Sequence, residues 1–426
     1  MAYEQVGTTG VMKKRILRLV AAMLAVTAIV VVSAGLTYYW CTRTVEVAVA
    51  GAGAGQDHSP GALHKVEQIG TYPCVMLRAL VSWGNLPEPI AVQYGARMYR
   101  VQYWTTTPAG AATVASGLVC VPYTRTPRGV VSYQHGTTMN RHLTPSAPTL
   151  IESGLGTALF AGGGYVLCAA DYVGLGTNRE VHPYLHAQGT ANAVIDLLKA
   201  ANAFVTSRDV EWPSSLCLIG FSQGGYSTLA AQRALESLGD PRFRVVACAP
   251  VSGPYDLAGV TFPAFLEATT ADRSGYLAYL ANAYCSAYGR PLDSLLTDEY
   301  ARQVPGLFDG EHDEWVVSGQ LPARPREIFR REFLEAYDAK QPTWFMTALA
   351  ENNVFQWAPK APVRLYYSDR DPLVLPREAH VALAEFQRRD CDVTAIAVAS
   401  VDHGGAILYA VPKIRNWFDE IAGKAK

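Results

Sequence analysis

A serine flanked by glycines is the residue best suited to nucleophilic chemistry. Gly220, Ser222 and Gly224 belong to the pentapeptide GFSQG, which follows the apolar run SLCLI and precedes the helix-like YSTLAAQRALESLG. On a turn this sharp the serine must adopt a strained backbone, and side chains at the flanking positions would collide with neighbouring elements. The pattern predicts that Ser222 is a nucleophile. A tight turn with an incidental serine is the alternative.

A serine hydroxyl needs a positioned base and a group that orients the base. In chains with this order of strand and helix, the acid and then the histidine follow the serine. His403 comes after the last apolar run, in SVDHGGA, and Asp371 comes after the run PVRLYYS. We therefore predict a triad of Ser222, Asp371 and His403. Asp369 is the alternative acid, and a plain surface loop is the alternative reading of the histidine.

Acyl transfer also needs two N–H donors for the oxyanion of the tetrahedral intermediate. The backbone N–H of Gln223, next to the nucleophile, is the first expected donor. The loop HGTT after the run VVSYQ should supply the second, from Thr137 or alternatively Thr138. His182 and His186 are interpreted as structural or rim residues. No Cys or His spacing suggests a metal site, and this chemistry requires no organic cofactor.

The segments around these residues alternate between two patterns. Short apolar runs are typical of strands buried on both faces of a sheet, and longer periodic segments are typical of helices. The predicted strands are 97–107, 113–122, 128–136, 164–172, 215–222, 244–253, 362–371 and 393–405, and the predicted helices are 186–207, 226–239 and 406–423. This order predicts an α/β fold with a doubly wound, mostly parallel sheet, opened by an antiparallel pair. Pro412 should kink or split the last helix.

One long interval interrupts the alternation. Residues 256–360 have a helical, aromatic-rich pattern without a convincing strand, which predicts a helical cap inserted into a core formed by 66–255 and 361–426. Residues 41–65 are rich in small residues and predict a flexible linker. Most cap aromatics should form the cap's own core and a few should line the acyl site, from a set comprising Tyr279, Tyr284, Trp315, Phe329, Phe333, Trp344, Phe345 and Trp357.

The first forty residues predict the compartment. Lys13, Lys14 and Arg15 precede a long apolar run, which reaches the ~20 residues that cross a bilayer. Residues 1–40 are therefore predicted to be a cytoplasmic basic segment and a transmembrane anchor, with the rest of the chain outside the cytoplasm. A cleaved signal peptide, which would release the protein, is the alternative.

Composition argues against one class of partner and does not decide whether the cysteines form a disulfide. The 36 basic and 37 acidic residues nearly cancel, so nucleic acid is not an expected partner. Of eight cysteines, those inside apolar runs are expected to be buried thiols: Cys120, Cys168, Cys217 and Cys248. Cys74, Cys285 and Cys391 could contribute to a disulfide in an exported protein. The oligomeric state is not indicated.

Several of these segments together resemble the α/β-hydrolase superfamily and, within it, the secretory lipase family of the Candida antarctica lipase A type. The resemblance runs from residue 65 to residue 425 and is carried by VVSYQHGTT, GYVLCAADYVGLGTNREVHPYLHAQGTANAVIDLLKAA, LIGFSQGGYSTLAA, SDRDPLV and DHGG. It implies a Ser–Asp–His triad, here Ser222, Asp371 and His403, that hydrolyses carboxylic esters, including triacylglycerols, beneath a helical lid.

We accordingly expect a serine hydrolase of the lipase or esterase type that acts on an ester or lipid substrate and is tethered to a membrane or exported. A serine peptidase or an acyltransferase could use the same triad. A non-catalytic binding protein on the same fold is the alternative from another class.

Overall fold

The computed structural model of the protein describes residues 44–48, 57–147 and 151–424. The predicted basic segment and anchor or signal peptide, 1–40, lie outside these ranges, as does part of the predicted linker. Among the described residues, no helix combines the length and the apolar character that crossing a bilayer requires.

The core of the described chain is a ten-stranded sheet. Its strands are β1 (Val45–Glu46), β2 (Leu63–Tyr72), β3 (Ala96–Thr106), β4 (Ala112–Pro122), β5 (Val130–Gln134), β6 (Val166–Ala170), β7 (Ser215–Phe221), β8 (Arg244–Val251), β9 (Val363–Tyr367) and β10 (Val393–Ala397). They are arranged in the order β1-β2-β3-β4-β6-β5-β7-β8-β9-β10. The strands from β1 to β6 in this order pair antiparallel, and those from β6 to β10 pair parallel.

The strand order reverses direction around β5. The chain passes from β5 to β6 on one side and then returns to place β7 on the other side of β5. Open α/β sheets bind ligands at such a switch point, outside the carboxyl ends of the strands. The loop after β5 and the turn after β7 therefore meet where a site is expected.

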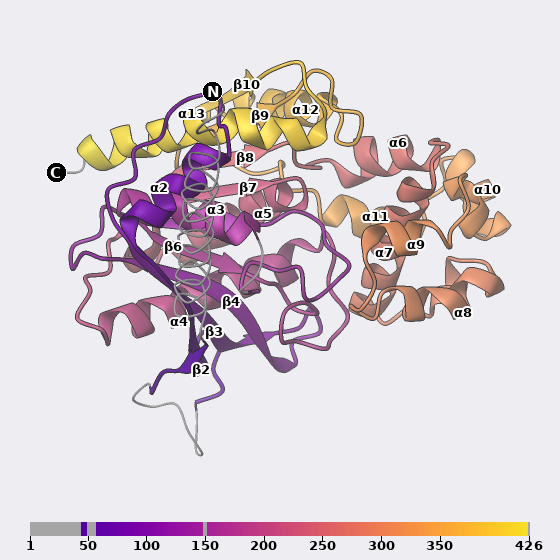
Figure 1. The fold of residues 1–426 in the computed structure, drawn as a ribbon. Helices are drawn as coiled ribbons and strands as arrows, with labels where there is room; N and C mark the ends of the chain where they lie inside the picture. Colours follow the sequence, from indigo (N-terminus) through magenta and orange to yellow (C-terminus); the bar gives the residue numbers. More distant parts are fainter. Residues whose placement is uncertain (1–43, 49–56, 148–150, 425–426) are drawn as a thin grey trace, which may run out of the picture. The chain divides into compact units, whose positions relative to one another are not determined.

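Helices cover both faces of the sheet, because each strand of the parallel half carries apolar side chains on both sides. The outer helices are α2 (Cys74–Trp83), α3 (Ile151–Leu159), α4 (Ala187–Thr206), α5 (Gln223–Leu238), α12 (Arg377–Gln387) and α13 (His403–Lys424), with short 3₁₀ turns at Ala161–Gly163 and Pro241–Phe243. One apolar cluster packs α4, α5 and α12 against the sheet, and the other packs α2, α3 and α13 against the opposite face. Figure 1 shows α4 and α13 on opposite sides of the sheet.

The interval between β8 and β9 is built of helices and turns. It contains a π-helical turn (Leu257–Thr261), α6 (Phe262–Leu266), α7 (Ala271–Ala287), α8 (Asp298–Leu307), α9 (Glu314–Ser318), α10 (Arg331–Asp338) and α11 (Trp344–Glu351), with 3₁₀ turns at Leu292–Ser294 and Pro325–Ile328. The helices α6 to α11 gather together beside the sheet-bearing part of the chain (Figure 1). Phe262 packs edge to face against Phe329, Phe333 and Phe345, so these rings form the interior of this insertion.

Several elements differ from the sequence-based expectation. The range 41–65 includes the start of β2 and the whole of β1, which pairs antiparallel with Glu67 and Gln68 further along β2. Pro412 lies inside α13 and does not split it. The helices α2, α3 and α12 were not predicted; α3 reads IESGLGTAL, and its two glycines weaken the helical signal that burial against the sheet overrides.

The suggestion of a disulfide is wrong for the described cysteines. Cys74, Cys285 and Cys391 are all free, and so are the four cysteines of the apolar runs. Cys285 is buried within α7, where its thiol packs as a small apolar group. Within the described part of the chain, no covalent link adds to the stability of the packed core.

Candidate active site

The turn after β7 has the strained geometry that GFSQG predicts. Ser222 has φ 58° and ψ −123°, a backbone conformation that residues other than glycine rarely adopt. Its N–H donates to the carbonyl oxygen of Val251 on the neighbouring strand at 2.9 Å, which holds the residue in place. A Cβ at Gly220 would overlap the backbone of Gly224, and one at Gly224 would overlap the carbonyl of Gln134. The two glycines are therefore sterically required.

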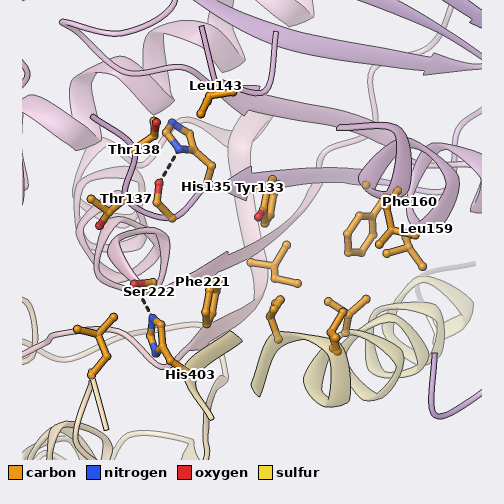
Figure 2. Close-up of a pocket in the computed structure, with 18 of the residues that line it drawn as sticks. Tyr133, His135, Thr137, Thr138, Leu143, Leu159, Phe160, Phe221, Ser222 and His403 are labelled. Carbon is orange, nitrogen blue, oxygen red and sulfur yellow. Dashed lines mark hydrogen bonds between the residues drawn. The ribbon is translucent and has the colours of Figure 1, made fainter. Parts of the chain in front are cut away.

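The structure brings together the three side chains predicted as a triad. His403 Nε2 lies 2.8 Å from Ser222 Oγ, and His403 Nδ1 lies 2.7 Å from Asp371 Oδ2. Figure 2 shows the serine and the imidazole facing each other at one end of a cavity. The histidine is the first residue of α13, and the ring of Phe221 packs against its imidazole.

The acid loop after β9 carries two aspartates, of which Asp371 is buried and Asp369 is exposed to solvent. Asp371 is buried, and its Oδ1 accepts the N–H groups of Leu373 and Val374, both at 2.9 Å. Burial raises the pKa of Asp371, but its hydrogen bond to His403, the imidazole's charge and these backbone donors outweigh burial and lower the pKa. Asp369, the alternative acid, is exposed and accepts from Ser400 instead.

A buried hydroxyl ties the acid loop to the loop that carries the histidine. Ser368 Oγ donates to the carbonyl oxygen of Val401 at 2.6 Å and accepts the N–H of the same residue at 3.1 Å. The two loops therefore keep a fixed separation. Sequence reasoning did not identify Ser368, because no local pattern shows that two loops 33 residues apart are neighbours.

The residue after the nucleophile is held by a histidine. Gln223 begins α5, so its N–H belongs to the first turn, where helix donors have no intrahelical partner. Its side-chain Nε2 lies 2.8 Å from His182 Nε2, and His182 Nδ1 lies 2.8 Å from the carbonyl oxygen of Val173. Burial lowers the pKa of His182 to about 3, so the ring is neutral, donates from Nδ1 and accepts from Gln223. This agrees with the structural role expected for His182.

The loop after β5 passes close to the serine. A Cβ added at Gly136 would lie 3.7 Å from Ser222 Cβ, and Gly136, Thr137 and Thr138 line the same cavity as the serine. The hydroxyl of Thr137 lies 3.1 Å from that of Tyr184. The loop is also joined to the inserted helices, because Tyr279 on α7 donates to the carbonyl of Thr138 at 3.3 Å.

The cavity next to Ser222 has a volume of about 480 Å³ and is mostly apolar. From the serine it extends between α3 and α13, as the positions of Phe160, Leu159 and His403 in Figure 2 show. None of the cap aromatics named from the sequence is among the described residues that line this cavity. A different aromatic residue of the cap, Tyr276, does line it. The expectation that cap aromatics such as Trp315 line the acyl site is therefore not met for this cavity, and Trp315 is exposed.

Among the described residues, no three His, Cys, Asp or Glu side chains converge in a way that could hold a metal ion. The polar groups that line the cavity are hydroxyls, backbone donors, the imidazoles of His135 and His403, and one carboxylate, that of Glu314. Such a set can perform proton transfer and nucleophilic chemistry on a bound carbonyl compound.

The topology of the sheet and the strained serine at its switch point define an α/β-hydrolase fold. The family model described as Secretory lipase matches residues 147–425, well over half of the sequence. The chain belongs to the secretory lipase family. A comparison with curated protein sequences found no match.

Several solved structures, in contrast, are similar to this chain. A protein of Legionella pneumophila is 27% identical and aligns over 84% of this chain and 97% of its own, with a TM-score of 0.78. The rice cell wall degrading esterase LipA of Xanthomonas oryzae is 25% identical over 86% of this chain and 100% of its own, with a TM-score of 0.73. Candida antarctica lipase A shares the fold at 14% identity, covering 85% of this chain and 83% of its own, with a TM-score of 0.64. Family and fold place the chain among lipase- and esterase-like hydrolases.

Proposed function

We propose that this chain hydrolyses carboxylic esters through a covalent acyl-enzyme, with Ser222 as nucleophile, His403 as general base and Asp371 as the orienting acid. The observation that carries the proposal is the uninterrupted hydrogen-bonded series from Asp371 through His403 to Ser222, with distances of 2.7 and 2.8 Å. Both distances fall in the range in which a proton can pass between the partners.

The chemistry proceeds in two balanced halves. Ser222 Oγ attacks the ester carbonyl carbon while its proton moves to His403 Nε2, and the imidazolium then gives that proton to the departing alcohol. A water molecule next loses a proton to the same nitrogen and attacks the acyl-enzyme, which releases the carboxylic acid and restores the serine hydroxyl. Asp371 stays ionised throughout, since its pKa is lowered, and it stabilises the imidazolium.

The negative charge on the carbonyl oxygen requires donors that are already in place. The backbone N–H groups of Gln223 and Thr137 are proposed for this role, with Thr138 as the alternative to Thr137. The position of Gln223 at the start of α5 supports its assignment, because the positive end of the helix dipole also faces the oxyanion. The close approach of Gly136 to Ser222 supports a donor from the neighbouring loop.

A series of nitrophenyl esters with increasing acyl length tests the proposal. The intact protein should hydrolyse these esters and leave peptide anilides nearly untouched, and Ser222→Ala should lower kcat by about 10⁵-fold or more. Ser214→Ala, the same change at an exposed position before β7, is the matched control and should be neutral. Turnover that persists in Ser222→Ala, or a preference for anilides, would refute the assignment.

We further propose that the catalytic part acts outside the cytoplasm, carried there by the basic and apolar residues of 1–40. Family membership supports export, and whether that segment remains as an anchor is decided by fractionation. Recovery of the active chain in the membrane pellet identifies an anchor, recovery in the medium identifies a cleaved signal, and recovery in the cytoplasm contradicts both.

A further inference from the structure

The cavity next to Ser222 has two chemically different ends. One end lies between α3 and α13 and is lined by Leu155, Phe160, Ile407 and Val411; we call it the apolar arm. The other end is formed by the loop after β5 and by the cap. There the lining residues are Thr137, Thr138, Tyr276 and Glu314, which we call the polar wall. Ser222 also lines this cavity, so a substrate bound at the serine can meet both surfaces.

The carboxylate of Glu314 is the charged group of the polar wall. It accepts a hydrogen bond from the hydroxyl of Tyr276, a buried residue of α7. Among the described residues, no lysine, arginine or histidine lies within ion-pair distance of Glu314, although Arg141 and Arg179 both pair with nearby Glu311. A partly buried carboxylate whose partner is a single hydroxyl gains from a further hydrogen-bond donor or a cation, which a ligand in the cavity can supply.

The charge of Glu314 acts on the hydroxyls beside the serine. Burial first, and the charge of Glu314 in addition, raise the pKa of both Tyr276 and Tyr184. Tyr184 in turn is hydrogen-bonded to Thr137, whose backbone is the proposed oxyanion donor. The carboxylate is therefore close enough to act electrostatically on the hydroxyl that contacts Thr137, and it is not an isolated surface charge.

Building on the proposed ester hydrolysis, we propose that Glu314 determines specificity by recognising an electropositive group, a hydroxyl hydrogen or an ammonium, on the alcohol moiety of the ester. The two substituents of an ester diverge from its carbonyl carbon. When the acyl chain fills the apolar arm, the alcohol moiety faces the polar wall. A hydroxyl there donates to the carboxylate oxygens, whereas an alkyl group leaves the carboxylate without a partner and an anionic group is repelled.

The substrate class that fits both ends is therefore an ester of an apolar acid with a hydroxylated or cationic alcohol. The proposal thus gives a role in substrate recognition to Glu314, a cap residue outside the three segments that carry the proposed triad. Tyr276 is a positioning residue in this scheme, since its hydroxyl fixes the orientation of the carboxylate.

Binding to the Ser222→Ala protein tests this proposal without requiring turnover. The probes share one acyl group and differ in the alcohol: propyl octanoate, 2-hydroxyethyl octanoate, octanoylcholine and the octanoyl ester of glycolate. Calorimetry should rank the hydroxyethyl and choline esters above the propyl ester and the glycolate ester last. Glu314→Leu, made in the same background, should lower the preference for the hydroxyethyl ester over the propyl ester about tenfold, which corresponds to 1.4 kcal/mol.

A second variant separates the two sources of positive character. Glu314→Gln keeps a hydrogen-bond acceptor and removes the charge, so it should lose the preference for octanoylcholine and keep part of the preference for the hydroxyl. Glu332→Gln, an exposed carboxylate on α10 of the same cap, is the matched control and should change neither ratio. The propyl ester serves as an internal reference, because a misfolded variant would lose its affinity too.

Equal ratios in Ser222→Ala, Glu314→Gln and Glu314→Leu would overturn the proposal. That result is distinguishable from a failure of the proposed function, which would appear as the absence of ester hydrolysis by the unmodified protein. Selective binding without hydrolysis would leave the recognition by Glu314 in place and remove only the catalytic role.

Discussion

Asp371 is positioned by its own loop before any contact with the imidazole. Two backbone N–H groups hold Oδ1, which leaves Oδ2 facing His403. Asp369, two residues earlier in the same loop after β9, is exposed. The pair therefore offers a matched comparison between a buried acid and a solvated acid in one loop.

Asp371→Asn should lower kcat for a nitrophenyl ester by about 10⁴-fold, because an amide cannot stabilise the imidazolium and favours the wrong tautomer. Asp369→Asn should stay within about twofold of the unmodified protein, since its exposed carboxylate touches no reacting group. Steady-state kinetics of both variants checks this. Equal losses in the two variants would mean that the acid has been misassigned.

The backbone of Ser222 predicts an inverted order of stability between two variants. A variant with alanine is normally more stable than one with glycine at the same position, because glycine loses more conformational entropy on folding. At φ 58° and ψ −123° the strain on a side-chain-bearing residue is about 1–3 kcal/mol. Urea denaturation should therefore give Ser222→Gly a free energy of unfolding about 1 kcal/mol higher than that of Ser222→Ala. The usual order would show that the turn is not strained.

Residue types and chain order were sufficient to predict which side chains could form the triad, because the pentapeptide and the loops after two apolar runs are local signals. Glu314 and Tyr276 carry no such signal. They lie among many acidic and aromatic cap residues, and only the packing of α7 and α9 shows which of them reach the cavity.

At the scale of elements, a buried carboxylate joins the helix after the acid loop to the first turn of the cap. Glu378 on α12 accepts the N–H groups of Tyr255 and Asp256 at 2.8 and 2.7 Å and the hydroxyl of Thr261 at 2.5 Å. Burial raises its pKa to about 8, and the nearby charge of Asp256 adds to the effect.

This shift predicts a pH dependence with a definite sign. The unfolded chain ionises Glu378 above its ordinary value of 4.5, whereas the folded protein keeps it protonated up to about 8. Its contribution to stability is therefore complete below pH 4.5 and is lost as the pH rises towards 8. The glutamine in Glu378→Gln does not titrate. Between pH 4.5 and about 8 the free energy of unfolding of the unmodified protein should therefore fall relative to that of Glu378→Gln. Urea denaturation at several pH values measures this difference. For Glu332→Gln the difference should stay flat, and a flat difference for Glu378→Gln would contradict the shifted pKa.

The parallel half of the sheet was predictable because strands buried on both faces are continuous apolar runs, as in β5, β6 and β7. Elements that depend on tertiary contacts were not. The strand β1 lies in a range that is typical of a flexible linker, and it forms by pairing with Glu67 and Gln68 beyond that range. The helix α3 forms despite its glycines because the neighbouring α2 and the sheet bury it.

Across the described molecule, stability comes from two apolar clusters on opposite faces of one sheet and not from covalent links. Burial raises the pKa of Cys120 and of Cys285 to about 12, so these thiols stay protonated and unreactive at neutral pH. A domain that is expected to work outside the cytoplasm is therefore folded without help from an oxidising compartment.

Thermal unfolding should consequently be insensitive to the redox state. The Tm should agree within about 1 °C with and without dithiothreitol, because a lost disulfide would cost about 2–5 kcal/mol and several degrees. Iodoacetamide should modify the partly exposed Cys74 and Cys391 and spare Cys120 in the folded protein. A large drop in Tm under reducing conditions would indicate a bond that the described cysteines do not form.

The helix α13 combines two roles within a few residues. It begins with the imidazole at 403 and, one to two turns later, contributes Ile407 and Val411 to the wall of the cavity. A bulky chain that pushes this helix outward would also move the proton acceptor away from the hydroxyl. Remodelling the cavity for longer chains at these two positions would therefore change turnover as well as selectivity, whereas enlarging it from the α3 side would leave the imidazole undisturbed.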